Sequence, residues 1–128
     1  MMLTYGSLNK HLRERFPILD SPKYTDMIGG IEAGPYVIFG VLFNHYLVEV
    51  AGEADTQQTA RIAEFLEEMI ACGDLEVANL LKMEILPTLL KSQAIVEAYW
   101  PWLGDGMRHE LILLAPRAAP GLRVPPES

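Results

Sequence analysis

His45 and Glu49 are the two side chains whose spacing best suits metal or acid–base chemistry. They stand four residues apart, so one face of a helix would present both to an ion. A di-iron bundle would require Glu-x-x-His pairs on two helices, and the chain contains no such pair. His109 and Glu110 are adjacent, so they would point apart on a helix. We therefore expect no metal and no cofactor, and interpret His45 as the point where a buried helix reaches the surface or a polar contact.

Carboxylates in the middle of the chain form a second group of candidates. Glu67 and Glu68 are consecutive, and Glu64 precedes them by one helical turn. They lie opposite the apolar stripe of their helix, which predicts exposure to solvent. Exposed carboxylates make poor general acids or bases, because their surroundings do not tune them. We interpret them as a solvated face or a surface that binds a partner, together with Glu53 and Asp55 in the preceding loop.

Nucleophilic catalysis has no recognisable motif in this chain, which lacks both Gly-x-Ser-x-Gly and a glycine-rich phosphate loop. Cys72 is the single cysteine, so it cannot form an internal disulfide, and we interpret it as a structural thiol. Trp100 and Trp102 lie in the densest aromatic cluster. Such side chains fill a core when buried and anchor a partner when exposed. We expect no catalytic residue, and keep both tryptophans as candidates for partner binding.

The charge balance limits the class of partner. The 128 residues carry 17 acidic and 10 basic side chains, a net charge of −7. Such a charge favours solubility, and it would also steer a basic protein towards this one. Nucleic acid is not an expected partner, because the Lys and Arg residues are scattered.

Targeting signals are also missing from the sequence. The N-terminus has no basic head followed by an apolar run, so we expect no signal peptide. The most apolar stretch, residues 36–50, is shorter than the roughly 20 residues that span a bilayer. We therefore expect no membrane contact and a cytoplasmic location.

The elements that position these residues centre on an αα-hairpin over residues 55–90. Asp55 begins a capping box with Gln58, and the helix that follows carries its apolar residues at spacings of three and four. Gly73 can end that helix in the left-handed conformation, and Asp74 can cap the next one at once. A junction this short forces the two helices to lie back to back. The residues of the apolar stripe are Ile62, Phe65, Leu66, Met69 and Ile70.

The second helix of the hairpin, residues 75–90, is apolar almost all round, which predicts burial on all sides. Pro87 lies within it and leaves the Met83 carbonyl without its usual donor, so we expect a kink or an early end. Ser92 can cap a further helix that reaches Trp100.

The rest of the chain gives less uniform signals. We expect helices at 7–16, 36–51 and 107–114, with a strand as the alternative for the last, and a short helical turn followed by a loop at 20–34. The fold class is all-α, with five or six helices paired as antiparallel αα-hairpins. The hairpins form either a compact bundle or a short stack like HEAT repeats. Residues 1–115 form a single domain, and 116–128 form a Pro-rich flexible tail.

Three stretches between residues 36 and 104 carry a family resemblance. They are Tyr36-Val-Ile-Phe-Gly-Val-Leu42 with Leu47, the run from Ile62 to Met69 continued by Gly73 to Leu81, and Ile85-Leu86 continued to Gly104. Together they resemble a bacterial all-helical family of unknown function that has members among the immunity proteins of polymorphic toxin systems.

The resemblance implies an immunity protein that neutralises a cognate toxin by occluding its active site. That toxin would be basic and would act in the cytoplasm, in keeping with the acidic charge. The alternative is a non-catalytic adaptor that binds a helix of its partner in an apolar groove. A third reading, a small enzyme, would use His45 and Glu49, with His109 as a further candidate.

Overall fold

The computed structural model describes residues 3–29 and 33–124, and this part of the chain is all-α. The helices outnumber the five or six expected. No described residue lies in a strand, so the strand alternative for 107–114 is wrong. The α-helices are α1 (Leu8–Arg15), α2 (Pro22–Thr25), α3 (Pro35–Val37), α4 (Asn44–Glu53), α5 (Thr56–Ala71), α6 (Leu75–Leu80), α7 (Leu86–Leu89), α8 (Gln93–Tyr99) and α9 (Asp105–Ala118).

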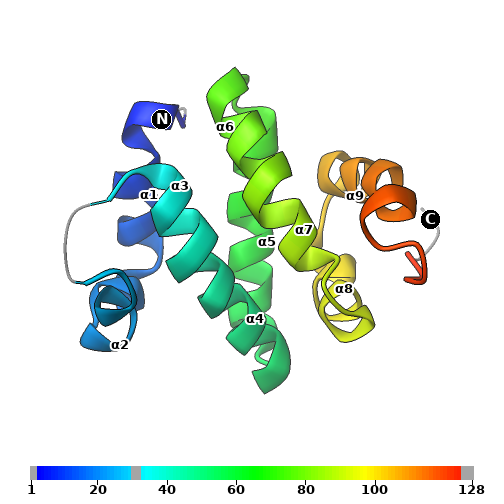
Figure 1. Cartoon of the computed structure of the whole chain (residues 1–128), viewed down its shortest axis with the longest axis horizontal. Helices are drawn as coiled ribbons and strands as arrows, with labels where there is room; N and C mark the ends of the chain where they lie inside the picture. The colour runs from blue at the N-terminus through cyan, green and yellow to red at the C-terminus, as the bar shows by residue number, and fades with distance from the viewer. Residues whose placement is uncertain (1–2, 30–32, 125–128) are drawn as a thin grey trace.

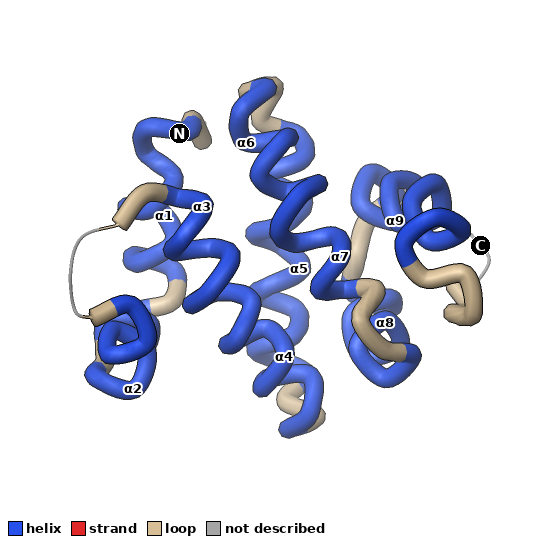
Figure 2. Tube along the Cα trace, viewed as in Figure 1, coloured by secondary structure: helices blue, strands red, loops and turns tan. Residues whose placement is uncertain are grey.

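Two long rods form the centre of the molecule (Figure 1). The first joins α3 and α4 through a π-helical segment, Ile38–Phe43, and the second joins α6 and α7 through another, Leu81–Ile85. The helix α5 packs between the rods, and the chain alternates in direction through these elements as αα-hairpins do (Figure 1). The helices α1 and α2 lie on one side and α8 and α9 on the other, and Figure 2 shows short connections between helices.

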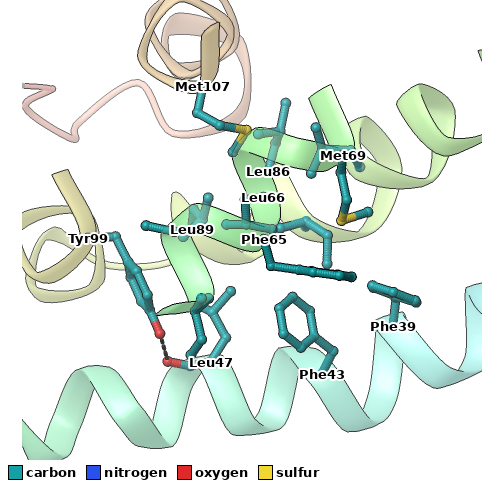
Figure 3. Close-up of a cluster of buried hydrophobic side chains, with 14 of the residues drawn as sticks. Phe39, Phe43, Leu47, Phe65, Leu66, Met69, Leu86, Leu89, Tyr99 and Met107 are labelled. Atoms are coloured by element: carbon teal, nitrogen blue, oxygen red, sulfur yellow. Dashed lines mark hydrogen bonds between the residues drawn. The ribbon is translucent and has the colours of Figure 1, made fainter. Parts of the chain in front are cut away.

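The hydrophobic core joins both rods to α5 (Figure 3). Phe65 of α5 lies with its ring centroid 6.0 Å from Phe43 and 6.3 Å from Phe39 of the first rod, and all three side chains are fully buried. The hydroxyl of Tyr99 donates to the carbonyl of Leu47 at 2.6 Å, so the core also ties α8 to α4. Four residues of the stripe on α5 (Ile62, Phe65, Leu66 and Met69) are buried and Ile70 is half-buried, which explains why the stripe is so regular in the sequence.

The signals that start and end the hairpin helices are confirmed, whereas the capping box predicted at Asp55 is only half formed, because the side chain of Gln58 accepts from Tyr46. The side chain of Asp55 accepts from the backbone N–H of Gln58, and that of Asp74 accepts from Glu76 and Val77. Gly73 has a φ of 81°, in the left-handed region that favours glycine. Gly73 and Asp74 fix the reversal between α5 and α6, and Asp55 fixes the start of α5 after α4.

The kink or early end expected at Pro87 is replaced by a change of helix type: a π-helical segment ends at Ile85, and α-helix continues through Pro87 to Leu89. A π turn shifts the hydrogen-bonding register by one residue and so accommodates the N–H that proline lacks. The carbonyl of Glu84 in this segment accepts from the side chains of Asn44, at 2.8 Å, and Thr88, at 3.1 Å. Asn44 belongs to the first rod, so this bond links the two rods.

Several sequence expectations need correction. Residues 75–90 are not buried on all sides, because Leu75 is 80% and Met83 67% exposed. The last helix runs past 114 to Ala118, through Pro116, and residues 119–124 fold back towards α8. The other part of the expected tail, 125–128, lies outside the described residues, as do residues 30–32 of the expected loop at 20–34.

Candidate functional site

Glu67 caps a neighbouring helix and does not lie free in solvent. One of its carboxylate oxygens accepts from the backbone N–H of Gly104 at 2.7 Å and of Met107 at 3.2 Å, at the start of α9. The side chain is half-buried. A carboxylate at a helix N-terminus is stabilised by the free N–H groups and by the helix dipole. The predicted exposure of Glu67 is therefore wrong, because α9 covers the side of α5 that faces away from the apolar stripe.

Glu68 is likewise half-buried, and it forms a bidentate ion pair with Arg15 of α1. The hydrogen bonds from Arg15 lower the pKa of Glu68 below its ordinary 4.5, and burial opposes this shift. Glu64 is exposed, as predicted. Of the three carboxylates on α5, two are thus engaged with other helices, which corrects the prediction of one shared solvated face.

The two tryptophans divide between core and surface. Trp100 is 6% exposed, and the guanidinium of Arg108 donates to its carbonyl and lies 5.3 Å from its ring centroid. Trp102 is 46% exposed. The core interpretation therefore holds for Trp100, and Trp102 keeps the exposure that an anchor for a partner requires. Cys72 is half-buried and donates to the carbonyl of Met69, as a structural thiol does.

A cavity of about 360 Å³ lies at the corner where α4 ends and α5 begins, and residues of α2 also line it. We call it the corner cavity. Two of the predicted partner-binding residues, Glu53 and Asp55, line it. Its lining also includes the aromatic residues Phe16, Tyr24 and Tyr46, the polar residues Glu49 and Gln58, and the cations Arg15, Lys23 and Arg61.

Aromatic rings line the corner cavity. The ring centroid of Tyr46 lies 5.8 Å from that of Phe16 and 6.0 Å from that of Tyr24, in tilted and edge-to-face arrangements. The hydroxyl of Tyr46 donates to the side chain of Gln58 at 2.9 Å, and that of Tyr24 donates to Glu49 at 3.1 Å. Burial raises the pKa of both tyrosines above the ordinary 10.0. Both phenols are therefore neutral at physiological pH, and both side chains are buried, with Tyr24 2% and Tyr46 7% exposed.

Glu49 is the most heavily engaged carboxylate of the cavity. It accepts from Lys23 at 2.6 Å and from Tyr24, and it lies 2.8 Å from Nε2 of His45. The hydrogen bond from Lys23 is the main cause of a pKa below the ordinary 4.5, and burial opposes it. The sequence-predicted pair His45 and Glu49 is thus in contact, and Lys23 and Tyr24 of α2 hold the same carboxylate.

Glu53 and Asp55 are the carboxylates of the cavity that remain open to solvent. Neither forms an ion pair with another residue in the described ranges. One oxygen of Asp55 caps α5, which leaves the other for a ligand. The nearest cation of α5, Arg61, donates to the carbonyl of Arg15 at 2.9 Å.

Within residues 3–29 and 33–124, no group of three His, Cys, Asp or Glu side chains is arranged to hold a metal ion. His45 contacts Glu49 from outside the corner cavity, and neither His45 nor His109 lines that cavity. Sequence reasoning missed Tyr24, Tyr46 and Gln58, because they come from three separate segments and carry no shared motif. No helix in the described part of the chain has the length and apolar character needed to cross a membrane.

The chain belongs to the family described as Domain of unknown function (DUF7674), whose model matches residues 9–113. This match spans α1 to most of α9 and includes the corner cavity. It agrees with the expectation of a family of unknown function, and it carries no link to immunity proteins or toxins. No curated protein and no solved structure matches the chain.

Proposed function

We propose that this protein is a non-catalytic binding protein that neutralises a basic partner, as an immunity protein does for its cognate toxin in the cytoplasm. The observation that carries the proposal is the pair of open carboxylates, Glu53 and Asp55, at a cavity with aromatic walls. A Lys or Arg side chain of the partner would bring its charged head to these carboxylates.

The charges around the cavity explain why these two residues would recognise the partner. Glu49 already holds Lys23 and His45, so its charge is largely satisfied within the molecule. Glu53 and Asp55 remain for an incoming cation, and the net charge of −7 would speed the approach of a basic protein. The partner would then be inhibited because this protein covers its active site.

Co-expression with the product of the adjacent gene tests the proposal. We expect protection of the host from that product and a complex on a sizing column. The double variant Glu53→Gln, Asp55→Asn removes two charges while Asn still caps α5, so it should lose affinity and keep its stability. The matched control, Glu76→Gln on α6 with Asp105→Asn on α9, changes the net charge equally at two exposed positions and should bind as the unaltered protein does.

Two results would contradict the proposal. A neighbouring product that is harmless alone and forms no complex would remove the toxin role. Equal loss of affinity in both double variants would show that net charge, and not the corner cavity, determines binding.

A second candidate function, the adaptor, is favoured by a groove at the other side of the molecule. It measures about 350 Å³ and lies between α7 and α9, where Leu86, Leu113 and Leu114 form its apolar part. Lys82, Glu110 and Arg117 complete its lining. An amphipathic helix of a partner would place its apolar face here. The variant Leu113→Asp would abolish that interaction and leave binding at the corner cavity unchanged.

A further inference from the structure

The segment after α9 packs in a way that suggests a second binding site. Beyond Ala118 the chain turns, with the N–H of Leu122 donating to the carbonyl of Ala119 at 2.9 Å. Residues up to Val124 then run back to the start of α8 (red segment in Figure 1). We call residues 119–124 the strap.

Gln93, the first residue of α8, holds the strap by its backbone. Its side-chain amide donates to the carbonyl of Arg123 at 2.8 Å and accepts from the N–H of Arg123 at 2.9 Å. The pair of bonds reproduces the exchange that two opposed residues make in an antiparallel ladder. Glu97 accepts from the same amide at 2.8 Å and so fixes its orientation. These hydrogen bonds involve only the backbone of the bound residue, so they place no requirement on its side chain.

The side chains of the strap fill their surroundings incompletely. Leu122 and Val124, on either side of Arg123, are half-buried against the core. A cavity of about 340 Å³ lies between them and Ile112 and Ala115 of α9. A second cavity, of about 300 Å³, lies where Leu122 meets the start of α8. Side chains larger than Leu and Val would therefore find room on both sides of the clamped residue.

We propose that Gln93 and the two cavities beside the strap bind an extended peptide segment of a partner. The segment has apolar side chains before and after the residue that Gln93 clamps, and the strap occupies the site in cis. The hydrogen bonds that hold the strap are exposed, and segments held by few contacts open locally at low free energy. A partner segment with bulkier apolar residues would replace the strap and fill the cavities beside it. This site lies apart from the corner cavity and does not depend on the function proposed above.

Peptide binding to the full chain tests the inference. The probe is a fluorescein-labelled peptide with the sequence of residues 119–124, Ala-Pro-Gly-Leu-Arg-Val, and a second peptide with Phe in place of Leu and Val. The variant Leu122→Ser, Val124→Ser weakens the strap, so the probe should bind it about ten-fold more tightly than the unaltered protein if the strap fills the site about 90% of the time. The Phe peptide should bind more tightly than the first, because it fills the cavities.

Two further variants test whether peptide binding depends on the side chain of Gln93. Adding Gln93→Ala to the weakened strap should abolish binding of both peptides, with the helix content unchanged by circular dichroism. Arg123→Ala keeps the backbone bonds and should behave as the unaltered protein. The proposal would be overturned if the variant with the weakened strap bound neither peptide at about 1 mM, because a weaker affinity than this is too low for specific recognition. Amide hydrogen exchange at Arg123 as slow as that of the buried helix α5 would also overturn it, because the strap would then not leave the site.

Discussion

Substitution of Glu67 by Ala should destabilise the protein markedly, although Glu67 sits on the helix face that the sequence assigns to solvent. The carboxylate accepts two N–H groups at the start of α9, at 2.7 and 3.2 Å. It also fills the space beneath Gly104, where a Cβ would lie 2.9 Å from the carboxyl carbon. Loss of an N-terminal cap and of a buried acceptor costs about 1 kcal/mol for each bond. We therefore expect a loss of about 2 kcal/mol in the free energy of unfolding.

Urea unfolding followed by circular dichroism measures this loss. A change of 1 kcal/mol lowers the Tm of a domain of this size by about 4 °C, so Glu67→Ala should melt about 8 °C lower. Glu64→Ala, one turn earlier and exposed, is the matched control and should change stability by less than about 0.5 kcal/mol. Equal effects of the two variants would refute the assignment of Glu67 as the cap of α9.

The remaining predictions concern two features: the contact between the two rods, and the loss of stability at acidic pH, which we call the acid limb. Gly52→Ala in α4 meets no atom and should raise the free energy of unfolding by about 0.5–1 kcal/mol, whereas Gly40→Ala should gain less, because its Cβ would lie 2.8 Å from Oε2 of Glu84. An equal gain at both glycines in urea unfolding would contradict the close approach of the rods. The pKa values of Glu49 and Glu68 are lowered by folding, so their stabilisation is complete above pH 4.5 and is lost as the pH falls through their folded pKa values. Glu49→Gln with Glu68→Gln should flatten that acid limb, and an unchanged slope of stability against pH would count against these ion pairs.

Local signals predicted the fold well where they are self-contained. Asp55, Gly73 and Asp74 act on the backbone within a few residues, so the αα-hairpin could be predicted from the sequence alone. The π-helical segments could not, because the registers of the two rods are set where they pack together, at Gly40 and Glu84. Pro87 indicated the place of a disturbance in the second rod and left its form open.

The candidate site shows the same division. Helical periodicity assigned Glu67 and Glu68 to the face opposite the apolar stripe, and it cannot reveal that α9 and α1 cover that face. The corner cavity depends on side chains brought together by tertiary packing, such as Tyr24 and Tyr46. Local sequence sufficed to predict the exposure of Glu53 and Asp55, because they flank the turn between α4 and α5, although Glu53 is the last residue of α4 and does not lie in the loop.

The footprint of the partner on this protein is the most direct test of the account. Hydrogen–deuterium exchange of the complex with the adjacent gene's product should show new protection at residues 53–58, where α4 ends and α5 begins. A basic segment of the partner should become protected at the same time. Protection confined to the α7–α9 groove, or no protection at the corner in a complex that forms, would contradict binding through Glu53 and Asp55.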